Sequence, residues 1–232
     1  GSGEPTLHTG FGRVLDVIHD RAHLPSALLT NGTLLHLPEV RRDAARASIA
    51  KVTMSAADEK TWKRLHRPCP GLEFGPYMDG IVRFGAERQG ELWLEIMLVG
   101  GLNDDEAHIR RLAAWVEQAR PDRVQLNTVV RPPAEAEARP LDETHMEAIK
   151  SLFAGNVEII GRYKGPDAHY GKLSEDAIAG LVSRHPASAP EMARLFKTSA
   201  KKGQEVADGM LRAGRLTAER IGTEIYYRTP ID

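Results

Sequence analysis

The stretch that decides the fold is RVQLNTVVR, residues 123–131, which two prolines follow. Its β-branched and apolar residues predict a strand, and successive side chains of a strand point to opposite faces. Gln125 and Asn127 therefore share one face, while Val124 and Leu126 share the other. A half-exposed strand would show the same alternation, so the interpretation depends on whether other strands repeat it.

Two earlier stretches do repeat it: IAKVTMS, residues 49–55, and LWLEIML, residues 92–98. Their polar phases contain Lys51, Thr53 and Ser55 in the first stretch, and Glu95 with Trp93 and Met97 in the second. Strand and helix patterns alternate along the chain, which predicts a parallel sheet covered by helices. Because unpaired buried polar groups are costly, polar side chains repeated on one covered face predict a wet or ligand-filled cavity.

The expected elements follow the rhythm of consecutive right-handed βαβ units. The expected strands are residues 27–30, 49–55, 92–98, 123–131 and 157–160, and helices are expected to start near residues 11, 39, 58, 74, 103 and 142. No strand precedes the first of these helices. Polar residues that face one interior favour a partial α/β barrel, lacking its first strand or strands, over a doubly wound sheet. A barrel has its site at the C-terminal ends of its strands.

Two helix starts of this first part have a recognisable cap. Asp58 precedes a short amphipathic stretch and is a plausible N-cap. Asn103 and Glu106 have the spacing of a variant capping box. Both assignments predict where a loop gives way to a helix.

The chain is expected to divide into a barrel domain, residues 1–163, a linker, residues 164–172, and a winged-helix-like domain, residues 173–232. The last part reads as three helices and a hairpin, which is the winged-helix outline. The linker contains Gly165 and Pro166. A tail module for protein contacts or dimerisation is the alternative reading of the last part.

The caps of the last part are serines. Ser174 and Ser199 are expected to cap the first and third helices, and Ser188 with Glu191 to form a capping box for the second. The candidates for nucleic-acid contact are Lys197, Lys201, Lys202, Arg220 and Arg228. Glu205 and Asp208 lie on the same helix as two of these lysines, which weakens the case.

Composition sets outer limits on the function. The 232 residues suffice for one large domain or for a large domain and a small module. A net charge of -1, from 31 Lys and Arg against 32 Asp and Glu, argues against a protein that coats nucleic acid or membranes. Cys69 is the one cysteine, so no internal disulfide is possible, and no apolar run approaches membrane-spanning length. A cytoplasmic protein is the default expectation.

Common catalytic and metal motifs are missing from the sequence. The nine histidines are scattered without the paired spacing of a zinc site, so no metal site is predicted. There is no Gly-rich P-loop, nucleophile elbow or paired-carboxylate motif. No residue is assigned as catalytic on these grounds.

Several strand ends, taken together, resemble a known family. The segments are GEPTL at residues 3–7, LLTNG at 28–32, VTMSAAD at 52–58, EIMLV at 95–99 with Asn103 and Asp104, and residues 124–133. They resemble the core of radical S-adenosylmethionine (SAM) enzymes over roughly residues 3–160. The resemblance is greatest to the Fe-S oxidoreductase branch that includes the wybutosine-synthesising tRNA enzyme.

The resemblance implies roles for particular residues. Gly3, Glu4 and Pro5 would meet the methionyl amino group of SAM, and Asn31, Ser55 and Asp58 would lie near its carboxylate or ribose. The space beneath the adenosine and the substrate would be lined by Glu95, Met97, Gln125 and Asn127, and Arg131 could pair with an anionic substrate group.

Each of these residues has an ordinary structural alternative. Ser55 and Asp58 could be helix caps, Asn31 a turn residue, and Arg131 a solvated surface residue. Glu95 could form an ion pair with Lys51 on the neighbouring strand.

The resemblance also implies cofactors, SAM and a [4Fe-4S] cluster, and an electron donor. An intact parent oxidoreductase would cleave SAM reductively to a 5′-deoxyadenosyl radical that abstracts hydrogen from a substrate, RNA or a small molecule. The family holds its cluster on three cysteines, usually C-x3-C-x2-C, and this sequence offers Cys69 alone. We therefore expect a truncated, inactive fragment with neither cofactor bound. The alternative is a non-catalytic nucleic-acid-binding or regulatory protein.

Overall fold

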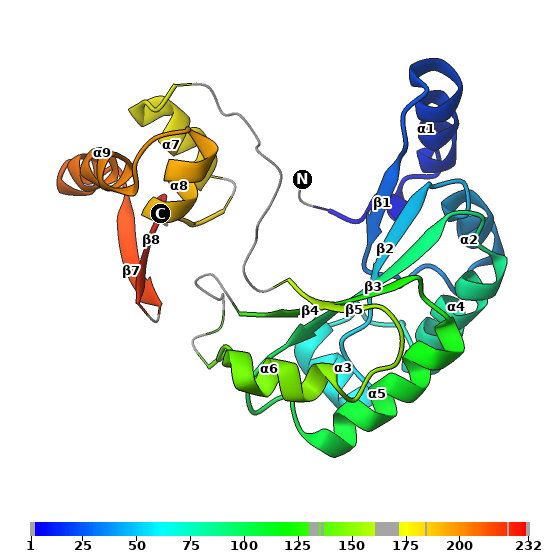
Figure 1. Cartoon of the computed structure of the whole chain (residues 1–232). Helices are drawn as coiled ribbons and strands as arrows, with labels where there is room; N and C mark the ends of the chain where they lie inside the picture. The colour runs from blue at the N-terminus through cyan, green and yellow to red at the C-terminus, as the bar shows by residue number, and fades with distance from the viewer. Residues whose placement is uncertain are drawn as a thin grey trace. The chain divides into compact units, whose positions relative to one another are not determined.

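The computed structural model describes residues 3–129, 135, 137–160, 172–183, 185–221 and 223–230 (Figure 1). Contacts divide the chain into two compact units, Gly1–Thr128 with Ala138–Gly161, and Val129–Glu137 with Arg162–Asp232. Most of the expected linker lies outside the described residues, as does Arg131. Across the described residues, no helix is both long enough and apolar enough to span a membrane.

The first unit is built on a five-stranded sheet. Its strands are β1 Ala27–Thr30, β2 Ile49–Thr53, β3 Glu91–Leu98, β4 Arg123–Thr128 and β5 Val157–Ile159. They lie in sequence order, and every neighbouring pair is parallel. Right-handed connections between strands in sequence order place the connecting helices on one face. The parallel α/β sheet is therefore confirmed, and its order differs from that of a doubly wound sheet, in which the strand order reverses.

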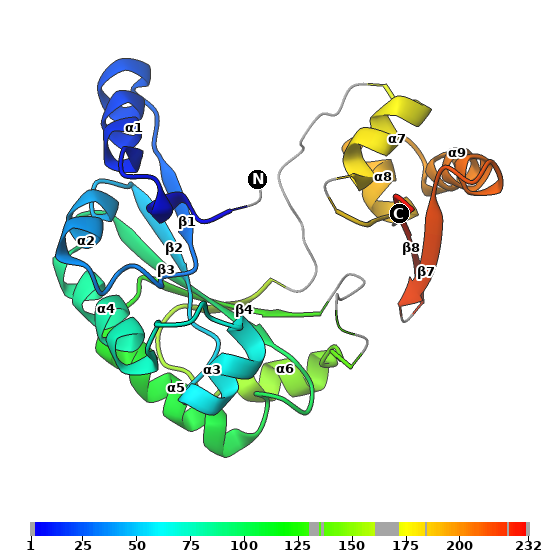
Figure 2. The same cartoon turned by 180° about the vertical axis from the view of Figure 1, so that it is seen from behind.

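Three helical segments precede β1, and further helices connect the strands. They are η1 Pro5–Leu7, α1 Phe11–Val17, η2 Ile18–Ala22, α2 Pro38–Ala44, α3 Glu59–His66, α4 Phe74–Glu87, α5 Glu106–Ala119 and α6 Glu143–Lys150. Figures 1 and 2 show α2, α4 and α5 along one side of the sheet. Asp58 caps α3 as expected, accepting a hydrogen bond from the Thr61 N–H. The predicted capping box of α5 is wrong, because its N-cap is Asp105 and the Asn103 side chain is used elsewhere.

The alternation of the strands builds the core of this unit. Alternate side chains of β3, from Leu92 to Leu98, are fully buried, together with Val52 of β2 and Leu126 of β4. They share one core cluster with side chains of α4 and α5. The two helices touch closely at Gly85, where an added Cβ would lie 2.0 Å from the Ala119 carbonyl oxygen. Only glycine fits there.

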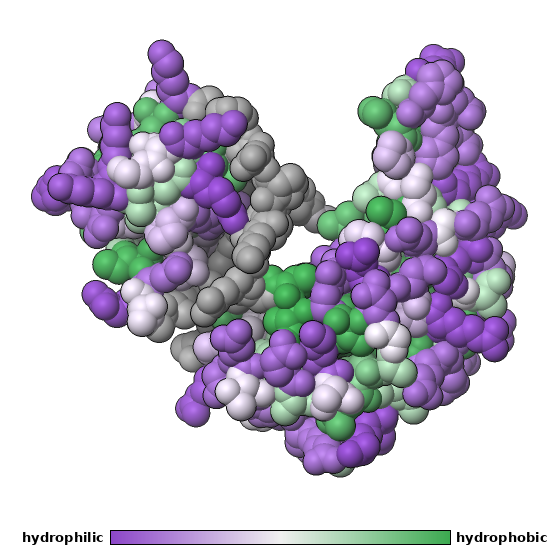
Figure 3. Space-filling model, viewed as in Figure 1, coloured by the Kyte–Doolittle hydropathy of each residue, from purple (hydrophilic) through white to green (hydrophobic). Residues whose placement is uncertain are grey.

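The surface of the first unit shows two kinds of region. Hydrophilic residues cover much of its helices, whereas hydrophobic ones reach the surface over α1 and β1 (Figure 3). The exposed large hydrophobic residues are Leu7, Val14, Val17, Leu24 and Leu29. All five come from the first 29 residues of the sequence.

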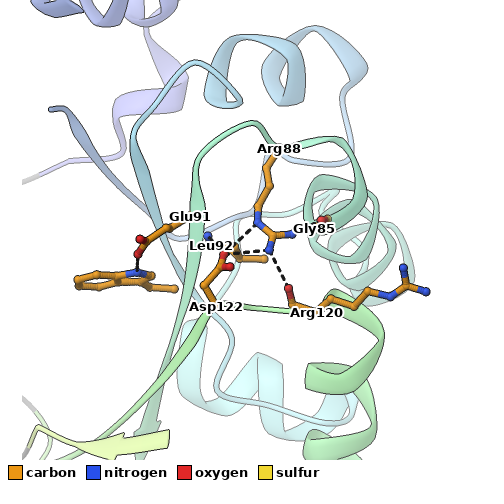
Figure 4. Close-up of polar contacts among 7 residues, drawn as sticks. Gly85, Arg88, Glu91, Leu92, Arg120 and Asp122 are labelled. Atoms are coloured by element: carbon orange, nitrogen blue, oxygen red, sulfur yellow. Dashed lines mark hydrogen bonds and ion pairs between the residues drawn. The ribbon is translucent and has the colours of Figure 1, made fainter. Parts of the chain in front are cut away.

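A charged cluster joins the loops that lead into β3 and β4 (Figure 4). The Arg88 guanidinium donates to the Asp122 carboxylate at 2.9 Å and to the Arg120 and Gly85 carbonyls. Asp122 also accepts the Leu92 N–H at 2.8 Å. Partial burial acts to raise the pKa of Asp122, but the hydrogen bonds from Leu92 and Arg88 outweigh it and hold that pKa below its ordinary value. The cluster lies at the N-terminal ends of the strands, the end of barrel folds associated with stability.

Asp122→Asn should destabilise the first unit by about 1 kcal/mol at neutral pH. This value is the contribution of a hydrogen bond to a charged group, reduced because Asp122 is partly exposed to solvent. A depressed carboxyl pKa adds stability above the unfolded pKa, and this stability is lost as pH falls through the folded pKa. The difference in free energy of unfolding between the wild type and Asp122→Asn should therefore shrink below about pH 4. Urea unfolding followed by tryptophan fluorescence tests this, since Trp62, Trp93 and Trp115 all lie in the first unit. Glu117→Gln, on the exposed surface of α5, is the control; an equal deficit in both variants would contradict the cluster's role.

The second unit is smaller and mixed. It contains α7 Glu175–Val182, β6 Ala187–Ser188, α8 Ala189–Leu195, α9 Ala200–Arg212, β7 Thr217–Ile221 and β8 Glu224–Arg228. The predicted hairpin of β7 and β8 is confirmed, and β6 extends it to an antiparallel sheet of order β6-β8-β7. Ser174 and Ser199 cap α7 and α9 as predicted. Ser188 occupies the N-cap of α8 without a capping hydrogen bond from its side chain, so that capping box is wrong.

The second unit has its own core, centred on fully buried side chains such as Ile178, Met192 and Tyr227. The Tyr227 hydroxyl lies 2.6 Å from the Asp208 carboxylate, which joins β8 to α9. Burial raises the pKa of Tyr227, and the bond to Asp208 raises it further, so the phenol stays protonated and donates.

Tyr227→Phe should destabilise the second unit by about 1–2 kcal/mol, because it removes a hydrogen bond to a charged group. Since the tryptophans lie in the first unit, the measurement is amide hydrogen exchange of α9. Thr217→Val removes an exposed hydroxyl whose contact with the Arg228 carbonyl is long, 3.5 Å. This control should leave the exchange rates of α9 unchanged; equal acceleration in both variants would contradict the assignment.

Candidate functional site

The face of the five-stranded sheet opposite the core is called the polar face here. In its central row, Thr53, Glu95, Gln125 and Glu158 are Cα partners on four successive strands. The neighbouring row runs through Leu29, Lys51, Trp93 and Arg123. The predicted parity of Glu95, Gln125 and Asn127 is confirmed, since the aliphatic side chains of these strands lie on the opposite face.

An ion pair occupies the middle of the polar face. Lys51 Nζ lies 2.8 Å from Glu95 Oε1, and the two side chains are 22% and 25% exposed. The structural alternative for Glu95 is thus present, but the pair is open to solvent on one side. Such a pair contributes modest stability, because water screens it and both long side chains lose rotamer freedom.

A second polar group lies toward β5. Gln125 Nε2 donates to Glu158 Oε1 at 2.7 Å, and Arg123 Nη1 lies 3.2 Å from the same oxygen. The Arg123 guanidinium also stacks over Trp93, 4.4 Å from the ring centroid. The hydrogen bond from Gln125 is the main cause that lowers the pKa of Glu158; partial burial opposes it, and Arg123 and Lys51 add to it. Glu158 is therefore held ionised.

A pocket of about 430 Å³ opens at the C-terminal ends of β1 and β2. Its lining residues are Gly3, Glu4, Leu29, Thr30, Asn31, Lys51, Thr53 and Glu95. Barrel enzymes have their active sites at the C-terminal ends of their strands, and this pocket is formed by the same ends. The pocket brings together Gly3, Glu4, Asn31 and Glu95 of the residues that the sequence singled out.

Glu4 builds the rim of this pocket. Its Oε1 accepts the Thr6 N–H at 3.1 Å and the hydroxyls of Thr6 and Thr30 at 2.6 Å each. Its Oε2 accepts the Asn31 N–H at 2.7 Å. One carboxylate thus ties the N-terminal segment to the end of β1, and charge-assisted bonds of this kind are among the stronger hydrogen bonds in proteins.

Asn31 has the role of a turn residue. Its Oδ1 accepts the Thr33 N–H at 2.9 Å and the Thr33 hydroxyl at 2.7 Å. These contacts fix the loop after β1, and Asn31 itself is exposed at the pocket. The turn alternative is therefore confirmed, and the residue still lines the site.

Ser55 and Asp58 have structural contacts and do not line the pocket. Ser55 is fully buried, and its Oγ accepts the Met97 N–H at 2.9 Å. Burial acts to raise the pKa of Asp58, but hydrogen bonds from Thr61 and Arg111 and the charge of His108 lower it. Both residues shape the loop after β2, and a contact of either with SAM stays a prediction.

The remaining predicted lining residues lie further along the sheet. Met97 and Asn127 are Cα partners on β3 and β4, and the Asn127 Oδ1 accepts the Thr128 N–H at 2.9 Å. Neither lines the pocket. Arg131 lies outside the described residues, so its contact with an anionic substrate group stays a prediction.

Sequence reasoning assigned no site role to four residues that line the pocket, Leu29, Thr30, Lys51 and Thr53. It also missed Glu158, which accepts a hydrogen bond from Gln125. The parity of β2 already placed Thr53 beside Lys51, so that residue could have been found. Glu158 required the register of β5 against β4, which no local pattern reveals.

The basic residues of the second unit are spread over several elements. Lys197 follows α8, Lys201 and Lys202 lie in the first turn of α9, and Arg220 lies on β7. Arg228 on β8 lies 3.7 Å from Glu219. Nothing in the comparisons favours nucleic-acid binding, which stays a prediction.

The residues present do not fit an iron-sulfur cluster. A [4Fe-4S] cluster is held by several thiolates, and the sequence has one cysteine, Cys69, which is exposed. Within the described part of the chain, no three His, Cys, Asp or Glu side chains come together as a metal-binding group. No chemical step is assigned to a cluster on this chain.

No family model matches the sequence. The GTPase Obg of Brachyspira hyodysenteriae is 28% identical over 235 residues, which cover 100% of this chain and 35% of that protein. UPF0026 proteins of Methanocaldococcus jannaschii and Helicobacter pylori are 24% and 27% identical over 230 residues, or 97% of this chain and 71% and 72% of those proteins. The chain thus spans about a third of the first relative and under three quarters of the others.

Solved structures identify the class of fold. A domain of the pyruvate-formate lyase-activating enzyme from Bacteroides vulgatus superposes with a TM-score of 0.54 at 18% identity, covering 68% of this chain and 95% of that domain. A radical SAM methyltransferase from Sphaerobacter thermophilus gives 0.55 at 20% identity, covering 68% of this chain and 48% of the methyltransferase. At these identities the likeness shows the fold alone. The parallel sheet is that of a partial radical-SAM-like fold.

Removing the ion pair on the polar face should leave the fold intact. In a double-mutant cycle of Lys51→Gln and Glu95→Gln, we expect a coupling of about 0.5–1 kcal/mol, as for partly exposed pairs. Urea unfolding followed by tryptophan fluorescence measures it. A loss above about 3 kcal/mol for either single variant is typical of a buried pair and would contradict an open polar face.

Proposed function

We propose that the first unit binds SAM in the pocket at the ends of β1 and β2, as part of a radical SAM enzyme. The observation that carries this proposal is the Glu4 carboxylate, which fixes Gly3 and the rest of the N-terminal segment beside Thr30 and Asn31. The fold shared with radical SAM enzymes supports it. We also propose that this enzyme belongs to the Fe-S oxidoreductase branch that includes the wybutosine-synthesising tRNA enzyme.

The lining residues suit the polar end of SAM. Backbone carbonyls near Gly3 can accept hydrogen bonds from an ammonium group, and the Asn31 amide and Thr53 hydroxyl can bind carboxylate or ribose oxygens. Lys51 adds a positive charge for the carboxylate. Bound SAM would supply the adenosyl group for radical chemistry, and this chain would hold and orient it.

Radical formation belongs to a longer parent protein, because this chain does not fit the iron-sulfur cluster. The parent would use an electron donor and act on RNA or a small molecule. Its coding sequence upstream of Gly1 tests this part of the proposal. Three closely spaced cysteine codons would support it, and their absence would leave a binding protein.

The second unit is proposed to be a winged-helix-type module. The order α7, β6, α8, α9, β7, β8 and the antiparallel sheet support this assignment. This module is stabilised by the helix caps at Ser174 and Ser199 and by the contact of Tyr227 with Asp208. None of these contacts indicates which partner the module binds.

SAM binding can be measured by saturation-transfer NMR, which detects the weak affinity expected without a cluster. Glu4→Ala removes the four hydrogen bonds that the Glu4 carboxylate accepts and should lower the affinity for SAM roughly tenfold or more. Glu39→Ala, at the exposed start of α2, should leave it unchanged. Circular dichroism checks that both variants fold. Equal SAM signals in the two variants, or none in the wild type, would refute binding in this pocket.

A further inference from the structure

One acceptor on the polar face has no donor. Gln125 is 7% exposed, its Nε2 donates to Glu158, and its Oε1 is buried without a hydrogen-bond partner. A buried acceptor in this state is costly, and such a group in a native protein calls for an explanation. A bound ligand that supplies the missing donor would provide one.

The geometry of the amide directs this acceptor away from β5. The two terminal atoms of an amide diverge, so the Oε1 of Gln125 is turned away from Glu158, which its Nε2 faces. The other row partner of Gln125 is Glu95 on β3. Neighbouring strands lie about 4.8 Å apart, so the side chains of two row partners are long enough to contact one small group bound between them.

Glu95 links this acceptor to the pocket. It lines the pocket, and among the described residues its contact is the one that Oε1 makes with Lys51. Its second oxygen is therefore a further acceptor. Lys51 already contacts Glu95, and Arg123 contacts Glu158 through Nη1. The Nε of Arg123 is itself a buried donor without a partner, so it does not satisfy Gln125 Oε1 either.

A ligand at this place must bring more than one donor. A hydroxyl group has one and cannot satisfy both acceptors, whereas an ammonium group has three and is attracted by the carboxylate. We propose that Gln125 and Glu95 form a subsite for a primary ammonium group on the substrate. This inference rests on the proposed function, because it names the chemistry of the second molecule that shares the site with SAM.

Three probes of equal chain length test the proposal: putrescine with ammonium ends, butanediol with hydroxyl ends, and succinate with carboxylate ends. Saturation-transfer NMR on the full chain should show binding of putrescine and not of the other two. Gln125→Met keeps the side-chain length and removes the acceptor, and should weaken putrescine binding roughly tenfold. Glu95→Gln should weaken it by a similar factor. Glu117→Gln, on α5, should have no effect.

Several results would overturn the subsite. Equal binding of putrescine and butanediol would show that charge and donor number do not matter. Unchanged putrescine binding in both Gln125→Met and Glu95→Gln would place the amine elsewhere, and no putrescine binding would refute the subsite. If Gln125→Met fails to fold, Glu95→Gln decides alone, with tryptophan fluorescence as the check on folding.

The outcome can be separated from that for SAM. Putrescine binding without SAM binding would refute the proposed function and leave the subsite. SAM binding without putrescine binding would refute the subsite alone. Displacement of putrescine by SAM, to the same extent in the wild type and in Glu4→Ala, would mean that the amino group of SAM itself occupies the subsite, and would overturn its assignment to a second molecule.

Discussion

The first unit depends on one constraint: strands in sequence order, joined by right-handed connections, can bury only one face of their sheet under their own helices. Alternate side chains must then differ in kind. Leu94 and Ile96 of β3 are fully buried in the core, while Glu95 between them carries its charge on the opposite face. The core and the candidate site are therefore two products of the same alternation.

This constraint explains why much of the fold could be predicted. The pattern of residues 123–131 located β4 and its polar face, and local chemistry located the caps at Asp58, Ser174 and Ser199. Prediction from local sequence failed where a side chain contacts residues that are far away in the sequence. Asn103 has the spacing of a cap, yet its amide donates to the Ser55 and Met97 carbonyls and its oxygen accepts the Val99 N–H. Those partners are 4 to 48 residues away.

The candidate site was predictable to the same extent. Gly3, Glu4, Asn31 and Glu95 meet in the pocket, because strand ends gather at one edge of a parallel sheet. The pairing of Gln125 with Glu158 was beyond prediction, since it depends on β5, whose three residues carry too little pattern to fix a register. The same limit hid β6, a strand of two residues.

The edge of the sheet at β1 has a practical consequence. Among the described residues, β1 pairs with β2 alone, so one row of its backbone N–H and C=O groups has no strand partner. Leu29, on β1, has a side chain that is 60% exposed. Val14 and Val17, on α1, are also exposed apolar side chains. An open strand edge beside apolar side chains is a template for self-association. A lysine at position 29 would discourage such stacking of molecules in concentrated solutions while leaving the buried face of β1 untouched.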